Sequence, residues 1–525
     1  MNKWILFCAL GIVLLALAGR WHGPGHGGAL KAVWKGNALE YTRYQGQRRI
    51  FSMRATSMQS EAGATAEFNQ VQISFFNAED RVFSVVQCQR LEASADRKRW
   101  RSDRPVQIEV QFPGSSLGAW AIQARSLQFD EASGMLRAVD VTGREGNSAQ
   151  LTIDAVQMRA GEERTALEGL TIWRGNGERL QARHGMLLWK EKILQLSQLH
   201  TQWRDVRLQA GAARMPLDAS GIRALQASDG VNLRESSEGV QRTTESQQLE
   251  ITLDEDGRLL HSHSHGQVRY EEAAHGKTPA WEARGADAQV DEKTSTIVLQ
   301  GAAQVQDADM LLFAGNMQVQ RITGEVLAHD SVEVRRTETD GSETRIRSRS
   351  ASLRRAMGVA HFVGATRLTN ANGSIEAPYM SLQWLRHTIK ADADAEQFVE
   401  IHWQMMGSGD ALKTLHSTSQ HLSCDSEAHH AHLSGNVQME QDEEKIQATR
   451  MDLDFEPIDT DGRLETRLLR WSAAGKTRWQ SGIREATAEE IVCEEAQRNC
   501  ILHGANAWMR EGTTETHQSS ISFTP

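Results

Sequence analysis

The chain has 525 residues, of which 24% are charged, and its formal net charge is −10. A chain of this length is expected to form two or more domains. Because nucleic-acid binding requires a basic face, the mildly acidic and mixed charge argues against that class of function. The five cysteines are widely scattered, so they predict neither a disulfide framework nor a CxxC metal site.

The N-terminus carries an almost purely apolar run from Trp4 to Ala18. This run is short for a membrane span of about 20 residues. It is either a signal peptide that is removed or an uncleaved single-pass anchor, and both interpretations place the rest of the chain outside the cytoplasm. We favour the anchor, because the charged region before the run is weak and Trp21 suits a membrane interface. Residues 1–21 are thus predicted to be a membrane anchor or signal segment, and residues 22–28 a flexible spacer.

Residues 29–245 show the apolar and polar alternation that is typical of strands with one buried face. The alternation is compact at first, as in Phe51, Met53 and Ala55, and becomes less regular after about Arg97. The stretch from Ala212 to Gln248 is polar. We therefore expect a junction between two β regions there, with the boundary between residues 245 and 246.

Residues 246–525 contain four copies of one pattern. Each copy is centred on a glycine: Gly301, Gly364, Gly435 and Gly504, at intervals of 63, 71 and 69 residues. Apolar residues recur at fixed positions before and after each glycine, mostly two residues apart. This period predicts short strands with one buried face and a tight bend at the glycine. Repetition predicts a stacked, mainly β structure. The last copy loses its second half, with Glu515 where an apolar residue is expected.

These features resemble a family of proteins that exports lipopolysaccharide. The N-terminal segment and the block from Gly46 to Val86, with Arg54-Ala55 at a strand end, are similar to the anchored periplasmic component (LptC-like). The repeats around Gly301 and Gly435 are similar to the OstA-like units of the soluble bridge component (LptA-like). The chain departs from the anchored component in length, because that component usually has one such domain. The resemblance implies an N-terminal membrane helix followed by half-open β-jellyroll repeats stacked into one or more grooved domains.

The resemblance also implies a site. In this family two facing sheets form an apolar groove, so the repeated apolar columns are expected to line a lipid-binding groove. The predicted groove residues are Val290, Leu299, Val305, Leu312, Leu353, Phe362, Leu368, Ile375, Leu433, Met439, Ile446, Leu502 and Trp508. The same alternation would also arise from a closed core, and the sequence does not separate the two.

The predicted function is that of a periplasmic lipid carrier in the inner membrane, conveying lipopolysaccharide from an inner-membrane ABC transporter complex toward the outer membrane. A second interpretation is secretion to the periplasm after signal cleavage. Alternative functions are a β-solenoid polysaccharide-acting or surface protein, and a structural periplasmic scaffold. We expect no enzyme activity and no cofactor, because no nucleophile elbow, HExxH, phosphate-loop or dinucleotide motif is present.

The shortened last repeat predicts an open edge strand, which another OstA-like bridge protein would extend by strand pairing. A capped edge is the alternative, since charged residues such as Glu515 and His517 discourage pairing.

Histidines and cysteines provide further candidates. His261, His263 and His265 alternate on one predicted strand, and a second group lies at His429–His432. We interpret them as polar strand faces rather than metal sites. Cys493 and Cys500 lie on the two arms of one predicted hairpin. They are either a cross-strand disulfide or two small buried hydrophobes, and the demanding geometry of a cross-strand disulfide slightly favours the latter.

Overall fold

The protein is described by a computed structural model. It covers residues 30–525 except 36–37, 46–47, 61–64, 77–81, 97, 111–119, 131–132, 134, 146–148, 160–163, 175–176, 189–190, 192, 217–223, 238, 255–257, 276–278, 339–340, 407–411 and 461–462. The predicted anchor or signal segment (1–21) and spacer (22–28) lie outside these ranges. Within the described residues, no helix is long and apolar enough to cross a membrane.

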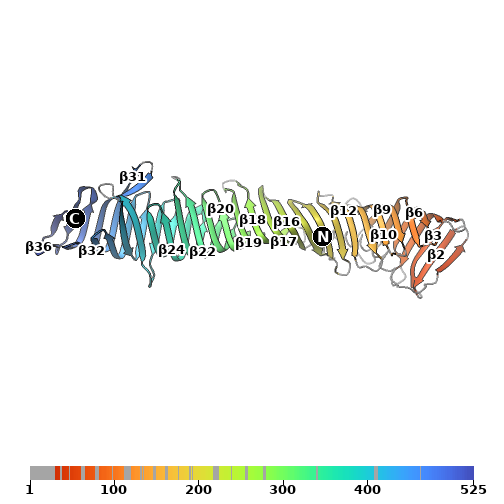
Figure 1. Cartoon of the computed structure of the whole chain (residues 1–525), viewed down its shortest axis with the longest axis horizontal. Helices are drawn as coiled ribbons and strands as arrows, with labels where there is room; N and C mark the ends of the chain where they lie inside the picture. The colour runs from red at the N-terminus through yellow and green to blue at the C-terminus, as the bar shows by residue number, and fades with distance from the viewer. Residues whose placement is uncertain are drawn as a thin grey trace. The chain divides into compact units, whose positions relative to one another are not determined.

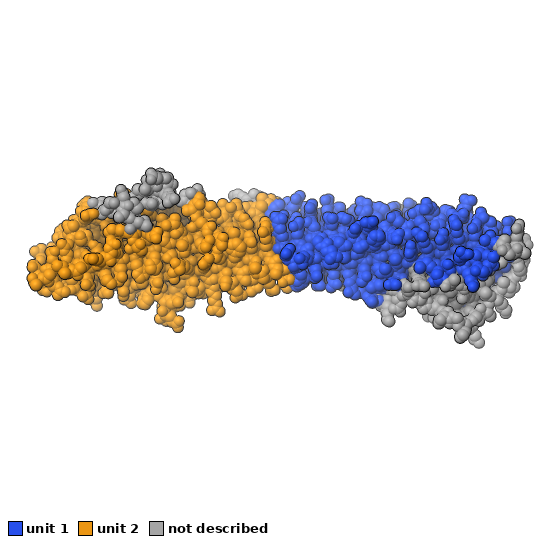
Figure 2. Space-filling model, in the orientation of Figure 1, with its two compact units in different colours: residues 1–273 blue, residues 274–525 orange. Residues whose placement is uncertain are grey.

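The described chain is almost entirely β-strand, as the alternation predicts. Its strands fall into two compact units, residues 1–273 and 274–525 (Figure 2). The prediction placed the division at 245 and 246, whereas strand β17 (Val240–Leu253) runs straight through that position. The reason is that the polar residues there alternate with buried ones such as Leu233 and Leu249, so the stretch is strand rather than junction.

The first unit contains strands β1 to β18. Their bounds are β1 Leu30–Lys35, β2 Ala38–Gln45, β3 Arg48–Ala55, β4 Ser57–Ser60, β5 Ala66–Phe76, β6 Val82–Ala93, β7 Arg99–Ser102, β8 Val106–Val110, β9 Trp120–Asp130, β10 Met135–Glu145, β11 Ala149–Arg159, β12 Arg164–Arg174, β13 Arg179–Leu188, β14 Ile193–Trp203, β15 Val206–Pro216, β16 Ala224–Ser237, β17 Val240–Leu253 and β18 Leu259–Glu272.

The second unit contains strands β19 to β37 and two short 3-10 helices. Their bounds are β19 Trp281–Asp291, β20 Thr296–Gln306, β21 Met310–Gln320, β22 Glu325–Thr337, β23 Glu343–Arg354, η1 Arg355–Met357, β24 Val359–Asn370, β25 Gly373–Gln383, β26 Thr388–Asp392, β27 Val399–Met406, β28 Leu412–Ser419, β29 His421–Asp425, β30 His430–Gln441, β31 Glu444–Thr460, β32 Arg463–Ser481, β33 Arg484–Glu494, η2 Glu495–Gln497, β34 Asn499–His503, β35 Trp508–Glu511, β36 Thr514–His517 and β37 Ser520–Phe523.

Within each unit the chain forms an antiparallel meander. From β9 to β18 each strand pairs with the strand before it and the strand after it. The same holds from β19 to β25 in the second unit. In Figure 1 the labelled strands of each unit accordingly follow one another in chain order. Such pairing contradicts the β-solenoid alternative, because coils of a β-helix pair in parallel.

The repeated glycines lie where long strands bend. Gly301 and Ala302 have φ angles of 74° and 53°, and Gly364 and Ala365 have 85° and 44°. The register shifts at the same place, between Gln300 and Ala303 in β20. Two consecutive residues with positive φ form a bulge that turns the strand, and a glycine adopts this conformation without a steric penalty. The predicted bend is confirmed for these copies.

The bends divide each long strand into two halves whose alternate side chains are buried. In β24, Phe362 is buried before the bend and Leu368 after it, with exposed fractions of 1% and 2%. Since the described chain offers only strands to cover these faces, the halves cover one another as two facing sheets. We call them, in the second unit, the Phe362 sheet (with 296–300 and 359–363) and the Leu368 sheet (with 303–306 and 366–370). Such a two-layered β structure is consistent with the expected jellyroll.

Candidate functional site

All but one of the predicted groove residues point into the interior between the two sheets. The prediction is wrong for Trp508, which pairs with Thr487 on the outer face of β33, whereas its neighbour Met509 pairs with the buried Ala486. The last copy lacks the second positive φ angle that follows the other repeat glycines, so its register differs by one residue. Every one is buried except Trp508, which is half-buried. The inward-pointing residues lie on the Phe362 sheet (Val290, Leu299, Leu353, Phe362, Leu433, Leu502) and on the Leu368 sheet (Val305, Leu312, Leu368, Ile375, Met439, Ile446). The structure therefore brings the predicted columns together as one apolar interior. Whether lipid enters it stays a prediction.

On the Phe362 sheet the buried residues form a continuous row, in which each residue is the direct cross-strand partner of the next. We call it the interior row: Ala288, Leu299, Met317, Ala328, Ala351, Phe362, Met380, Ala391, Leu422, Leu433, Met451, Ala473, Ile491, Leu502 and Ile521. Every member is apolar, and none is more than 8% exposed. The row thus forms an unbroken apolar surface along the second unit.

The opposite row on the Leu368 sheet contains one polar residue. It runs through Leu368, Ile375 and Ile401 to Ser417, and then to Met439. Ser417 is 1% exposed, and its hydroxyl has no hydrogen-bond partner among the described residues. A buried hydroxyl without a partner costs free energy, so hydrocarbon packing is less favourable at Ser417 than at its apolar neighbours in this row.

An ion pair joins the two sheets at their strand ends in the second unit. Asp307 follows β20 on the Leu368 sheet, and Arg355 begins η1 at the end of the Phe362 sheet. The Arg355 guanidinium contacts Oδ2 of Asp307, while Oδ1 accepts hydrogen bonds from the backbone N–H groups of Asp309 (3.1 Å) and Met310 (2.9 Å). The pair bridges the edge at which the strand ends of the two sheets meet, which we call the mouth.

Further along the same mouth, two carboxylates lie close enough for the charge of one to act on the other. Glu444 begins β31 on the Leu368 sheet, and Glu495 begins η2 on the Phe362 sheet. Burial, followed by the charge of Glu495, raises the pKa of Glu444. The indole N–H of Trp471 donates to Glu495 at 3.2 Å. The mouth therefore contains an attractive pair at one place and a repulsive pair at another.

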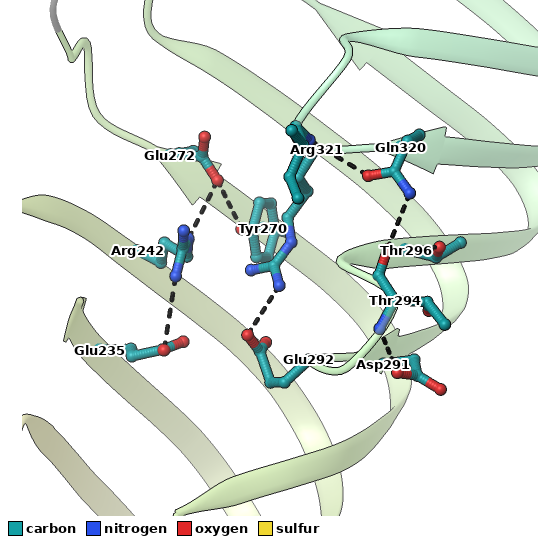
Figure 3. A network of polar contacts seen from close by, with 11 residues as sticks. Glu235, Arg242, Tyr270, Glu272, Asp291, Glu292, Thr294, Thr296, Gln320 and Arg321 are labelled. Carbon is teal, nitrogen blue, oxygen red and sulfur yellow. Dashed lines mark hydrogen bonds and ion pairs between the residues drawn. The ribbon is translucent and has the colours of Figure 1, made fainter. Parts of the chain in front are cut away.

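Polar clusters also hold strand ends in the first unit. Arg242 on β17 lies between Glu235 at 3.4 Å and Glu272 at 3.1 Å, and the Tyr270 hydroxyl donates to Glu272 at 3.0 Å (Figure 3). Arg242 and both carboxylates are largely buried, with exposed fractions of 17%, 16% and 11%. Such an arrangement fixes the ends of β16, β17 and β18 relative to one another.

A comparable cluster fixes hairpin ends in the second unit. Arg321, after β21, donates to Glu292, after β19, at 2.7 Å, and the Gln320 amide donates to the Thr294 carbonyl at 2.8 Å (Figure 3). Asp291 accepts from the backbone N–H of Thr294 at 2.9 Å. These two clusters thus hold charged groups at strand ends, outside the apolar interior row.

A separate concavity of about 580 Å³ crosses β13 to β17 in the first unit. Exposed side chains such as Arg214, Gln226 and Glu250 line it, and the Gln226 amide donates to Glu250 at 3.2 Å. None of the predicted groove residues lines this concavity, so it is distinct from the interior row.

The sulfur chemistry differs from the favoured prediction. Cys493 and Cys500 are direct cross-strand partners on β33 and β34, and they are joined by a disulfide. The preference for two reduced cysteines is wrong, because the hairpin brings their Cα atoms to 4.1 Å, close enough to bridge. Cys88 and Cys424 are free, and burial raises the pKa of each thiol to about 11.

The first histidine group lies on a strand, as predicted, while in the second group His430 and His432 lie on β30 and His429 in the preceding turn. His261, His263 and His265 alternate on β18 with the buried residues Ser262 and Ser264. In the second group, His430 contacts Asp454 at 2.8 Å and His432 contacts Asp452 at 2.7 Å. These histidines are therefore held by neighbouring carboxylates on the outer face of the sheet.

Comparison with known proteins adds one match by sequence. Among curated proteins none matches the chain. The crystal structure of LptH, described as the LptA homologous periplasmic component of the lipopolysaccharide transport device from Pseudomonas aeruginosa, is 11% identical; the match covers 23% of this chain and 92% of that chain. Its TM-score is 0.19, a likeness too weak to say anything further of this fold. Residues 416–524 match the family described as LptA/(LptD N-terminal domain) LPS transport protein, so this segment of the second unit is similar to that family.

Proposed function

We propose that this protein is a periplasmic carrier of lipopolysaccharide that holds the acyl chains between its two sheets. The observation that carries the proposal is the interior row, which is apolar without interruption and continues through the segment similar to the lipopolysaccharide transport family. The sugar and phosphate groups of the lipid would remain in solvent at the mouth. A carrier of this kind needs no catalytic residues.

The physical reason for such an interior is the cost of moving an acyl chain through water. Exposing each CH₂ group costs about 0.8 kcal/mol, so a chain of about a dozen carbons faces roughly 10 kcal/mol. An apolar surface along the whole path removes most of this barrier. Because the interior row repeats at each strand, the lipid would meet a similar surface at each step.

Loading the interior requires the sheets to separate, because its side chains are already packed against one another. The Asp307–Arg355 pair spans the mouth, so it would have to open or shift to admit an acyl chain. The bends at the repeated glycines would then be the hinge about which the two sheets part.

The partners at the two ends of the carrier are also part of the proposal. We propose that the N-terminal segment holds the chain at the inner membrane, beside an ABC transporter complex that supplies the energy. At the other end, β36 and β37 each pair on one side only among the described strands, with β35 and β34 respectively. An OstA-like partner would add its own strand to one of these edges.

Photo-crosslinking inside the cell envelope tests the carrier function. A photoreactive phenylalanine analogue is placed at Phe362, in the interior row, or at Phe313, on the outer face of β21 beneath Arg335. A lipopolysaccharide adduct at Phe362 but not at Phe313 is expected. Equal adducts at both positions, or none at Phe362, Leu299 and Leu433, would reject a lipid-filled interior.

The second candidate is a structural periplasmic scaffold, and one observation favours it. The interior residues are buried in the lipid-free chain, with Leu299 and Leu433 at 0% exposure, as in a closed core. A scaffold would yield purified protein without extractable lipid and no adduct at Phe362, so the same experiment separates the two functions.

A further inference from the structure

Three side chains with metal-binding groups meet on the outer face of the second unit. Glu400 and His402 lie two residues apart on β27, so they point to the same face. His416 on β28 is the direct cross-strand partner of His402. The neighbours Ile401 and Leu415 are 0% exposed and face the interior, so the three side chains face away from the interior row.

Their geometry allows one ion to be shared. The two imidazole rings stack at 4.4 Å between centroids with planes 13° apart. One ligand atom from each of the three residues lies within 4.8 Å of the others. Ligands roughly 2.1 Å from a common ion lie about 3 to 4 Å apart, so small side-chain rotations are enough to reach it.

These three side chains are also uncommitted to other polar partners. Among the described residues, none of the three forms a hydrogen bond or an ion pair, and the ring stacking is the contact they make. His421 of the same unit differs, since its imidazole is held by Asp392 at 2.8 Å.

The surrounding carboxylates are committed elsewhere. Glu376, the cross-strand partner of Glu400, pairs with Arg367 at 3.3 Å. Glu440, the partner of His416, pairs with Lys445 at 2.9 Å. The site therefore has three available ligands, and the neighbouring carboxylates are not among them because other side chains hold them.

We propose that Glu400, His402 and His416 bind a divalent first-row transition metal, with Zn²⁺, Cu²⁺ and Ni²⁺ as the suitable ions. Two imidazole nitrogens favour these metals over Mg²⁺ and Ca²⁺, which prefer oxygen ligands alone. The remaining coordination positions would be open to water or to a group from a partner. The bound ion would link β27 to β28 and stabilise that hairpin.

Calorimetric titration of the whole chain with ZnCl₂ tests the site. His416→Ala is expected to lose one equivalent of bound Zn²⁺ relative to the unmodified chain. Glu400→Gln is expected to weaken that equivalent by about tenfold or more, since even outer-shell partners of metal ligands change affinity by about this factor. The matched control is His361→Ala, which removes an exposed strand histidine of the same unit and leaves the stoichiometry unchanged.

Chemical footprinting locates the ion and separates it from metal held elsewhere. Zn²⁺ is expected to slow the modification of His402 and His416 by diethyl pyrocarbonate, measured by mass spectrometry, while His361 reacts at the same rate. Glu400→Gln should reduce the protection. Equal modification of His402 and His416 with and without Zn²⁺, or an unchanged stoichiometry in His416→Ala, would overturn the proposal whatever the lipid experiment shows.

Discussion

Asp307 and Arg355 form an ion pair that joins the two sheets of the second unit across the mouth. The partners are 48 residues apart and lie at the ends of different sheets. Their side chains are only 13% and 14% exposed, so solvent screens the pair less than it screens a surface ion pair. The pair therefore directly opposes separation of the two sheets.

Asp307→Asn is expected to break this ion pair and make separation of the two sheets easier. The substituted amide keeps an oxygen for the backbone N–H groups of Asp309 and Met310, so the turn is retained while the charge is lost. We expect the free energy of unfolding to fall by about 1 to 3 kcal/mol, because Arg355 loses a charged hydrogen-bond partner. Hydrogen exchange should become faster at residues 303–306 and 350–354.

The control for this variant is Glu325→Gln. It breaks the ion pair between Glu325 and Arg354, whose partners lie on neighbouring strands of one sheet. Both side chains are more exposed, and the pair does not cross the mouth, so exchange at 303–306 should be unchanged. If Asp307→Asn and Glu325→Gln behave alike, the mouth pair has no special role.

Gly373→Ala is expected to disrupt the pairing of β25 with β27. A Cβ atom at this position would lie 2.0 Å from the carbonyl oxygen of His402, and φ is 141°. Backbone cannot move away as a side chain can, so the strand pair must shift. A loss of about 3 kcal/mol or more in the free energy of unfolding is expected, measured by denaturant titration.

Gly341→Ala separates backbone strain from this clash. Gly341 has a φ of 83°, but a Cβ atom there would meet nothing within 4 Å. It should cost only about 1 to 2 kcal/mol, the penalty of a left-handed conformation. Equal losses for the two variants would show that close approach of β27 is unimportant.

The repeated columns predicted the interior well, because both the period and the chemistry of buried strand faces are local. Phe362 and Leu433 fall where the alternation places them, and Gly301 lies at a bend. The bend in β22 escaped prediction, since it lacks glycine. In β22 the bend is made by Asp330 and Ser331, with φ angles of 67° and 61°.

Contacts between distant segments could not be predicted from the local pattern. Nothing in the alternation pairs Asp307 with Arg355, because the pairing depends on how far the two sheets are offset along the mouth. His402 and His416 also escaped notice, since they are 14 residues apart and become neighbours only through the register of β27 and β28. The sequence pointed instead to histidines that are closely spaced along one strand.

Ala431→Cys is expected to create a second cross-strand disulfide with Cys424. These two positions pair directly on β29 and β30, as Cys493 and Cys500 do on β33 and β34. Oxidation should therefore remove the free Cys424 thiol, which mass spectrometry after alkylation of the unfolded chain detects. Retention of both thiols under oxidising conditions would show that the two hairpins differ in geometry.

The existing disulfide gives a matching prediction for stability. Cys493→Ser is expected to lower the free energy of unfolding by about 2 kcal/mol, because the bridge closes a short loop. The partners are only seven residues apart. The stability of the unmodified chain and that of the control Cys424→Ser, which keeps the bridge, should both fall on reduction, whereas the stability of Cys493→Ser should not respond to reductant.

Glu444→Gln is expected to stabilise the protein at neutral pH and not at acidic pH. Burial and the charge of Glu495 raise the pKa of Glu444 above its ordinary value of 4.5, so the folded chain retains a proton that the unfolded chain releases. The free energy of unfolding due to this group therefore falls as pH rises above about 4.5. Replacing the carboxyl by an amide removes that loss.

Thermal unfolding of both chains at about pH 4 and about pH 7.5 measures the effect. The variant should have the higher Tm at the upper pH, and the difference should be much smaller at the lower pH, where Glu444 is mostly protonated in both states. Glu443→Gln changes an exposed neighbouring carboxyl and should show no such pH-dependent difference. A Tm difference that is the same at both pH values would mean that the two carboxylates do not repel one another across the mouth.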